Sequence, residues 1–514
     1  MTTPTTTGQR LPRASGVLLH PSSLPGPHGC GDFGADAHRF VDWLASAGQR
    51  LWQILPLGGI GPGNSPYMSP SAFAGNLLLV DLHELQTLGW LDAQDLEPVA
   101  ALQADHVDFD AVVPYRMARL ERAARRFAAS GSAAQRADFA RFVDEQRSWL
   151  DDHALFMALG EAHPGCDWCG WPAPLARRDP SALDEARKHY AARIAFWQFG
   201  QWCFQRQWRA LRAHAHARGV RIVGDAPIFI AHHSAEVWAH PSLFELSSGG
   251  HPTVVAGVPP DFFSATGQRW GNPLYRWSAH AADGYAWWIE RMRRTFELVD
   301  IARIDHFRGF AAHWEIPATA PTAVEGRWVD GPGAALFDAI AAALGPPPVI
   351  AEDLGIITPD VDALRKHCGF PGMTVLQFAF GDDARNKYLP HHHEHDSVVY
   401  AGTHDNNTVA GWWAEAGDAE RGFARAYLAT DGHDMPWSLL RAACQSVSDT
   451  AIHQLQDVLA LPAACRMNYP GENQGWWEWR FQWPQLHPWH AERLAELVRL
   501  YGRNLDGPPA QPVI

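Results

Sequence analysis

The sequence predicts an α/β fold: a (β/α)8 TIM barrel with large insertions after its second and third strands. Short apolar runs recur along the chain, they are too short to be helices, and helical patterns lie between them. Runs of that kind are typical of buried parallel strands. Strand followed by helix, repeated about eight times, is the pattern that closes a barrel.

The composition is suited to one large core. The chain has 514 residues, of which 46% are hydrophobic and 19% charged, and this balance excludes disorder for most of its length. Such a length often corresponds to roughly three domains, but α/β barrels commonly exceed that unit as a single domain. We therefore expect residues 1–514 to form one barrel.

The expected strands follow from the apolar runs in chain order. They are residues 16–19, 51–55, 220–223, 301–304, 349–351, 373–378, 397–401 and 458–461. The clearest helical patterns between them lie at residues 35–47, 191–218, 285–298 and 334–344. The runs are apolar on both faces, as expected for strands covered by helices.

The spacing of the runs is uneven, which predicts two insertions. The second and third runs are much farther apart than a crossover helix requires. We expect an inserted subdomain at about 56–219, with a helical stretch at 114–159 and a turn at 168–174. A smaller insertion at about 234–279 is rich in Gly, Pro and aromatic residues, which favours a loop region over the barrel mouth.

Charge and cysteine usage limit the classes of partner. The 42 Lys and Arg residues against 56 Asp and Glu give a net charge of −14, which argues against a nucleic-acid partner. The sequence begins without a signal-like segment and has no apolar run of roughly eighteen residues, so no membrane partner is expected. The 7 scattered cysteines suit a reducing compartment, and we expect a cytoplasmic location. The oligomeric state stays open.

Acidic residues close four of the expected strands: Asp225, Asp305, Glu352 and, after the seventh run, Asp405. In a barrel, functional groups project from the carboxyl ends of the strands. A single carboxylate there would be ordinary, since Asp also caps helices. Four carboxylates on one rim repel one another, which costs Coulomb energy. A stable fold would therefore avoid such a cluster unless a catalytic reaction or a metal ion used it.

Two cationic side chains favour acid–base chemistry over a metal. Arg303 precedes Asp305 by two residues, and strand periodicity places both side chains on one face, where the guanidinium would keep the carboxylate ionised. His404 directly precedes Asp405. One ionised carboxylate, one protonated carboxyl and a third acid suit an oxocarbenium-like transition state, as in retaining glycoside chemistry.

Long motifs in one order cover nearly the whole chain. Two of them are 224–228 (Gly-Asp-Ala-Pro-Ile) and 303–309 (Arg-Ile-Asp-His-Phe-Arg-Gly). The others are 15–24, 64–76, 258–261, 266–275, 351–355, 402–408 and 466–471. Together they resemble the amylomaltases, the 4-alpha-glucanotransferases of the wider alpha-amylase group. The resemblance implies transfer of an alpha-1,4-glucan segment from a donor maltodextrin to an acceptor glucan or glucose, through a covalent glycosyl-enzyme.

The resemblance also implies a role for each acid: Asp305 as nucleophile, Glu352 as general acid and then base, and Asp405 as transition-state stabiliser. The sugar-binding residues that it implies are Ser65, Tyr67, Asp225, Gln268, Trp270, Arg303, His404 and Asn468. Gln268 and Trp270 resemble members of a loop that covers the glucan. The implied partners are alpha-1,4-glucans and maltooligosaccharides, with no cofactor and no metal.

Two alternatives stay open: a hydrolytic alpha-amylase-type glycosidase and an inactive glucan-binding relative. Hydrolytic amylases usually carry an Asn-His pair a few residues after the Asp of the third strand, whereas residues 225–229 here read Asp-Ala-Pro-Ile-Phe. A transferase also needs rings that stack sugars and exclude water, and about half of the candidates should simply be buried. The candidates are Phe262, Phe263, Trp270, Trp412, Trp413, Trp476, Trp477 and Trp479.

Two weaker metal-like patterns are interpreted as loops. Cys166 and Cys169 have the spacing of a zinc-binding pair, but a zinc site needs two more ligands and the sequence has no second pair. Residues 391–395 read His-His-His-Glu-His, and we expect a solvated loop there.

Overall fold

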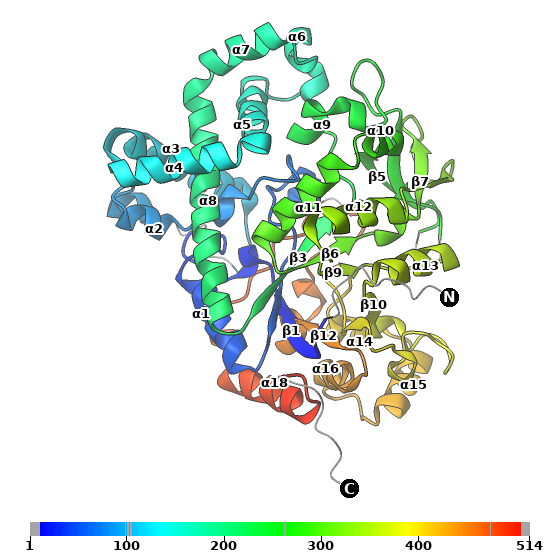
Figure 1. The fold of residues 1–514 in the computed structure, drawn as a ribbon. Helices are drawn as coiled ribbons and strands as arrows, with labels where there is room; N and C mark the ends of the chain where they lie inside the picture. Colours follow the sequence, from blue (N-terminus) through cyan, green and yellow to red (C-terminus); the bar gives the residue numbers. More distant parts are fainter. Residues whose placement is uncertain are drawn as a thin grey trace.

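Eight parallel strands curl into a barrel at the centre of the molecule (Figure 1). The computed structural model describes residues 11–504 except 98, 100, 101, 103, 104, 262, 263 and 473. The strands are β1 (Ala14–Leu18), β2 (Leu51–Gln53), β3 (Arg221–Pro227), β6 (Ile301–Asp305), β9 (Val349–Ala351), β10 (Gly372–Val375), β11 (Ser397–Tyr400) and β12 (Thr450–Gln454).

The sheet order is β10-β11-β12-β1-β2-β3-β6-β9, and every neighbouring pair in it is parallel. The two end strands, β9 and β10, also meet, because the Ala351 N–H donates to the Pro371 carbonyl at 3.0 Å. This contact nearly closes the sheet on itself. The predicted (β/α)8 barrel is confirmed.

Seven of the eight predicted strands overlap barrel strands, and the eighth prediction is wrong. Residues 458–461 lie at the end of the short helix α17 (Leu455–Val458) and beyond it, whereas the strand is β12. β12 carries Thr450, His453 and Gln454, and all three are buried. A search for apolar runs misses this strand because its polar side chains find partners inside the protein; the Gln454 amide, for example, donates to Asp457.

The predicted helices are present. They are α1 (Ala35–Ser46), α8 (Ala191–Ala217), α11 (Ala286–Leu298) and α12 (Ala334–Leu344). Further outer helices are α13 (Pro359–Cys368), α14 (Val409–Glu415), α15 (Asp418–Leu428), α16 (Met435–Gln445) and α18 (Pro488–Leu500). Around the barrel α18 contacts α1, α1 contacts α8, and α12 contacts both α11 and α13. Within the part of the chain that the structure describes, no helix combines the length and apolarity that crossing a membrane requires.

The chain between β2 and β3 is mostly helical. It contains α2 (Leu82–Thr87), α3 (Phe109–Ser130), α4 (Ala133–Glu145), α5 (Arg147–Ala162), α6 (Ala173–Ala176) and α7 (Pro180–His189). In Figure 1, α2, α3 and α4 lie at the left in blue to cyan, and α5, α6 and α7 lie at the top in cyan to teal, around the upper part of α8. α8 then carries the chain back to β3, and it contacts α1, α3, α4 and α5.

The region after β3 contains more regular structure than the predicted loop. It holds α9 (Ala235–Ala239), β4 (Val254–Val258), β5 (Gln268–Pro273) and α10 (Trp277–Ala282). β4 and β5 join β7 (Ala312–Pro317) and β8 (Arg327–Asp330), which follow β6, in an antiparallel sheet of order β5-β4-β7-β8. Sequence reasoning missed this sheet because its two halves lie on either side of a barrel strand.

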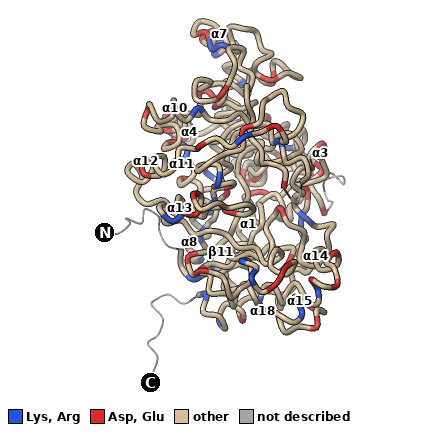
Figure 2. The backbone as a smooth tube through the Cα atoms, turned by 90° about the vertical axis from the view of Figure 1, so that its right-hand side faces the viewer, with Lys and Arg blue, Asp and Glu red and all other residues tan. Residues whose placement is uncertain are grey.

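The acidic excess is distributed over the fold. Figure 2 shows Asp and Glu scattered along the chain, with Lys and Arg interspersed among them. Many charges are paired locally; Arg178, for example, contacts Asp152 at 2.8 Å, and Lys366 contacts Asp362 at 2.8 Å. The net charge of −14 is therefore a property of the whole chain rather than of one segment.

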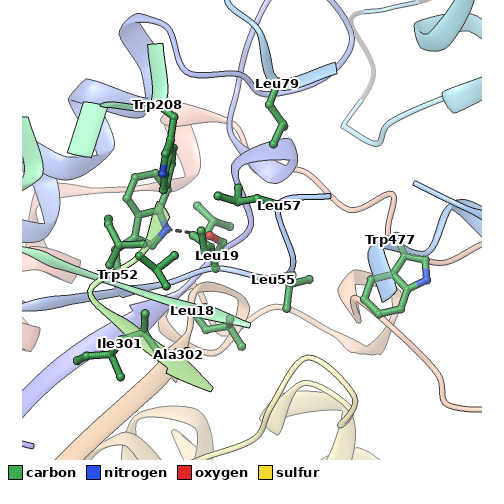
Figure 3. Packing of buried hydrophobic residues seen from close by; sticks show 14 of the residues in the cluster. Leu18, Leu19, Trp52, Leu55, Leu57, Leu79, Trp208, Ile301, Ala302 and Trp477 are labelled. Carbon is green, nitrogen blue, oxygen red and sulfur yellow. Dashed lines mark hydrogen bonds between the residues drawn. The ribbon is translucent and has the colours of Figure 1, made fainter. Parts of the chain in front are cut away.

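Buried tryptophans connect neighbouring elements of the barrel and its helices (Figure 3). Trp52 of β2 donates its indole N–H to the Leu19 carbonyl at 2.8 Å, and its ring packs edge-on against Phe40 of α1. Trp208 of α8 donates to the Leu298 carbonyl at the end of α11, also at 2.8 Å. Each indole therefore fills core volume and satisfies a buried carbonyl.

We expect Trp52→Phe to lower the free energy of unfolding by about 2–3 kcal/mol, because it opens a cavity and leaves the Leu19 carbonyl unpaired. Urea unfolding followed by tryptophan fluorescence and circular dichroism measures the change. Trp489 is 44% exposed, so Trp489→Phe serves as the matched control and should change stability by no more than about 0.5 kcal/mol. Equal effects of the two substitutions would contradict this account of Trp52.

Candidate active site

The predicted acids lie at the carboxyl end of the barrel strands. Asp225 is in β3, and Asp305 is the last residue of β6. Glu352 directly follows β9, and Asp405 lies in the loop after β11. The parallel register of β3 and β6 places Asp225 opposite Arg303, so the barrel itself brings these charged side chains to one rim.

Arg303 joins two of the acids. Its Nη1 donates to Asp225 Oδ2 at 2.6 Å, and its Nη2 donates to Asp305 Oδ1 at 3.0 Å. The side chains of Arg303 and Asp225 are buried, whereas that of Asp305 keeps 28% of its surface exposed. The alternation of side chains along a strand predicted the contact of Arg303 with Asp305. The contact of Arg303 with Asp225 follows from the register between β3 and β6. Of the three groups, Asp305 is the one open to a ligand.

Tyr67 connects Asp225 to His404. The Tyr67 hydroxyl donates to Asp225 Oδ2 at 2.8 Å and lies 2.8 Å from His404 Nε2, from which it accepts. The two rings are stacked, with an interplanar angle of 9°. Ser65 caps the short 3-10 turn Pro66–Met68, since its hydroxyl accepts the Tyr67 backbone N–H. Ser65 therefore positions Tyr67, a role that the sequence did not indicate.

Backbone amides hold Glu352. Its Oε2 accepts the His306 N–H at 2.7 Å, and its Oε1 accepts the Leu354 N–H at 2.9 Å. His306 has a left-handed backbone, with φ of 53°, which is a strained conformation for a residue other than glycine. Because His306 directly follows Asp305, this turn links the positions of the two carboxyl groups.

Asn468 and Arg466 orient Asp405. The Asn468 side chain donates to Asp405 Oδ1 at 2.6 Å, and its backbone N–H donates to the His404 carbonyl at 3.1 Å. Arg466 donates to the backbone carbonyl of Asp405. The other carboxylate oxygen of Asp405 lies 3.4 Å from His404 Nε2, and 37% of its side chain is exposed. Asp405 is thus fixed by its neighbours and open to solvent.

Gln268 and Trp270 lie two residues apart on β5. The Trp270 indole donates to Gln268 Oε1 at 3.1 Å, and its ring meets His306 edge-on at 4.9 Å. The inserted sheet therefore reaches the residue that follows Asp305. Phe262 and Phe263, which were also candidates for stacking sugars, lie outside the described residues.

Some of the candidate stacking rings are buried in the core, and the others are partly exposed to solvent. Trp477 and Trp479 are buried, and the Trp477 ring packs at 5.6 Å from Tyr67 and 5.9 Å from His404. Trp477 therefore supports that pair. The remaining described candidates are half-buried: Trp270, Trp412, Trp413 and Trp476. The Trp412 ring packs against Phe380, and the Trp413 ring lies under the Arg421 guanidinium. Part of each of these α14 rings is therefore used in packing within the protein.

Burial controls the ionisation of the cluster. Burial raises the pKa of Glu352, with Arg303 opposing, so this carboxyl retains its proton at higher pH than a free glutamic acid does. Burial also raises the pKa of Asp305, and Arg303 opposes the shift most strongly. Burial lowers the pKa of His404, which keeps the ring neutral. Nε2 of the neutral ring then bears the hydrogen that it donates to the Tyr67 hydroxyl in their hydrogen bond.

Sequence reasoning assigned no role to His306 or Arg466, although both contact the cluster. Both lie inside the long motifs, next to residues that were assigned: His306 beside Asp305, and Arg466 two residues before Asn468. That proximity is the only signal for them in the sequence. Their actual contribution depends on one left-handed turn and one loop-to-loop hydrogen bond, which no local pattern encodes.

A family model described as 4-alpha-glucanotransferase matches residues 19–486. The chain belongs to the 4-alpha-glucanotransferase family. A 4-alpha-glucanotransferase from Thermus thermophilus is 50% identical over 496 residues, which cover 95% of this chain and 98% of that protein. A chloroplastic/amyloplastic 4-alpha-glucanotransferase from Arabidopsis thaliana is 44% identical over 96% of this chain and 86% of its own length.

Solved structures agree with this 4-alpha-glucanotransferase assignment. An amylomaltase from Streptococcus agalactiae in complex with acarbose superposes with a TM-score of 0.93 at 37% identity, covering 96% of this chain and 99% of that one. An amylomaltase from Corynebacterium glutamicum, at 19% identity and a TM-score of 0.78, covers 95% of this chain and 75% of its own and shares the fold. The family resemblance that the motifs indicated is confirmed.

We expect Tyr67→Phe to lower kcat/KM for maltotriose by about 10- to 100-fold, the loss that follows when a hydrogen bond to a charged group is removed. The substitution keeps the ring that stacks on His404 and removes the hydrogen bonds of the hydroxyl to Asp225 and His404. Tyr501→Phe is the matched control, since that hydroxyl accepts from Arg441 at the other end of the barrel. An unchanged kcat/KM in Tyr67→Phe would show that the hydroxyl does not matter.

Proposed function

We propose that this member of the 4-alpha-glucanotransferase family transfers alpha-1,4-glucan segments between maltooligosaccharides, with retention, through a covalent intermediate on Asp305. The observation that carries the proposal is the buried Arg303, which binds both Asp225 and the partly exposed Asp305. The guanidinium opposes the rise in pKa that burial imposes on Asp305, so the pairing favours the ionised carboxylate, which is accessible for nucleophilic attack. Glu352, whose pKa is raised by burial, supplies a proton beside it.

In the first step, an Asp305 oxygen forms a bond to the anomeric carbon of the donor glucan, and the glycosidic C–O bond breaks. Glu352 gives its proton to the leaving O4, which departs as the new non-reducing end of the released fragment. Positive charge develops at the sugar ring in the transition state, and Asp405 stabilises it. Asn468 fixes Asp405 for this role through its hydrogen bond of 2.6 Å.

In the second step, the Glu352 carboxylate takes the proton of the acceptor 4-OH while that oxygen attacks the anomeric carbon and displaces Asp305. Two inversions give net retention. A hydrolase forms the same intermediate but admits water, so the family's transfer chemistry depends on positioning the acceptor better than bulk water. We propose that the 234–279 region supplies this positioning through Gln268 and Trp270, with the 56–219 subdomain carrying Tyr67.

We also infer a cytoplasmic location. All seven cysteines, Cys30, Cys166, Cys169, Cys203, Cys368, Cys444 and Cys465, are free thiols, which suits a reducing compartment. The plant relatives are chloroplastic or amyloplastic, and therefore also act inside a cell.

Incubation with maltotriose should give glucose together with a ladder of longer maltodextrins, which chromatography resolves. Asp305→Asn should abolish both products because the neutral amide cannot form the glycosyl-enzyme. Asp383→Asn is the matched control, since that exposed carboxylate pairs only with Arg385 on the surface, and it should retain full activity. Hydrolysis products without longer chains would support the amylase alternative, and an active Asp305→Asn enzyme would remove Asp305 from its role.

The rate should fall as pH rises through the raised pKa of Glu352, because deprotonation removes the general acid. Glu352→Gln should lose maltotriose transfer by at least about 100-fold, as expected for a general acid. A donor with fluoride as leaving group needs no proton and should still load Asp305 in this variant, which mass spectrometry would detect. Glu496→Gln on α18 is the control and should leave the pH profile unchanged. A wild-type profile in Glu352→Gln would overturn the assignment.

A further inference from the structure

Three segments that are distant in sequence meet outside the carboxylate cluster. The first is the Cys166–Cys169 segment after α5, the second contains His232 in the loop after β3, and the third is the turn that contains His251. Asp167, Cys169 and His251 each offer one ligand atom, and these atoms all lie within 4.8 Å of one another. Among the described residues, this is the only such group of three His, Cys, Asp or Glu side chains.

His232 lies beside two of these three residues. Its Nε2 lies 3.7 Å from Cys169 Sγ and 2.9 Å from the Gly250 carbonyl, which can only accept, so this nitrogen carries the hydrogen. With the hydrogen on Nε2, the neutral form of the ring offers the lone pair of Nδ1 to a metal ion. That Nδ1 faces Asp167 Oδ2 at 3.8 Å. A histidine that donates one ring N–H to a backbone carbonyl is the usual arrangement of a metal ligand.

The surrounding packing holds the segments together. The buried Trp168 donates its backbone N–H to His233 Nδ1 at 3.1 Å and its indole N–H to the His232 carbonyl at 2.9 Å. Gly250 has φ of +85°, and a Cβ there would lie 2.4 Å from the Trp168 ring and 3.0 Å from Cys169 Sγ. The turn is therefore packed directly on the cysteine segment, which brings His251 to Cys169 independently of any ligand.

We propose that Asp167, Cys169, His232 and His251 bind one Zn²⁺ ion that clamps the helical insertion to the insertion after β3. A thiolate, two imidazoles and a carboxylate form the tetrahedral donor set that zinc prefers, whereas Mg²⁺ and Ca²⁺ require oxygen ligands. The absence of a second cysteine pair had favoured a plain loop, but the additional ligands are histidines from later in the chain. This clamp is separate from the glycoside chemistry.

Binding requires Cys169 to lose its proton. The Zn–S bond forms as the S–H bond breaks, and the proton passes to the buffer. Cys166 is not part of the group of Asp167, Cys169 and His251, and its Sγ donates instead to the His163 carbonyl at 3.4 Å. It provides a matched control in the same segment.

The test uses the full-length protein after treatment with a chelator. Titration with ZnCl2 in a calorimeter should show one tight site whose affinity rises with pH, and zinc should raise Tm. Titration with CoCl2 should produce a sulfur-to-cobalt charge-transfer absorption. Cys169→Ser should abolish that absorption, and His251→Ala should weaken zinc binding by about 10- to 100-fold. Cys166→Ser should behave as the wild type does.

The absorption distinguishes this site from adventitious binding. The exposed His391 and His392 could take up zinc, but a site there has no thiolate and produces no charge-transfer band. The proposal fails if the wild type gives no such band, if Cys169→Ser retains it, or if Cys166→Ser loses it. It also fails if MgCl2 raises Tm as much as ZnCl2 does. None of these measurements depends on glucan transfer.

Discussion

The contact of Arg303 with Asp225 and Asp305 is the interaction on which the rest of the site depends. A buried guanidinium is stable only when its charge is compensated, and removing one partner of such a pair leaves an expensive unpaired charge. Here both partners come from adjacent barrel strands, so the register of β3 and β6 sets the geometry. Asp225 in turn fixes the Tyr67 hydroxyl by a hydrogen bond, and that hydroxyl fixes the His404 ring.

The second constraint is the backbone around His306. Its left-handed conformation directs an amide at Glu352, and its ring is covered edge-on by Trp270 of the inserted sheet. Strain of this kind persists only where the surrounding structure holds it. Through Trp270, the insertion after β3 therefore supports the turn that relates Asp305 to Glu352. The same insertion carries His251, so the proposed zinc clamp and the site share a supporting element.

Most barrel strands and one ion pair could be predicted from the sequence, whereas β12 and the antiparallel sheet could not. The apolar strands and the Arg303–Asp305 pair follow from local periodicity, which is why both were predicted correctly. β12 was misplaced because its buried residues include Thr450, His453 and Gln454, and an apolar-run criterion cannot distinguish satisfied polar residues from surface ones. The sheet of β4, β5, β7 and β8 was missed for a different reason: its strands pair across an intervening barrel strand.

The sequence by itself determined the barrel, the family and the identity of the charged residues, because each depends on residue type and short-range spacing. Only the tertiary structure decided which of these residues touch. The bridge from Tyr67 to His404, the hold of Asn468 on Asp405 and the meeting of Cys169 with His251 all join segments far apart in the chain. Their positions are set by strand register, one left-handed turn and the packing of insertions, which are properties of the folded chain as a whole.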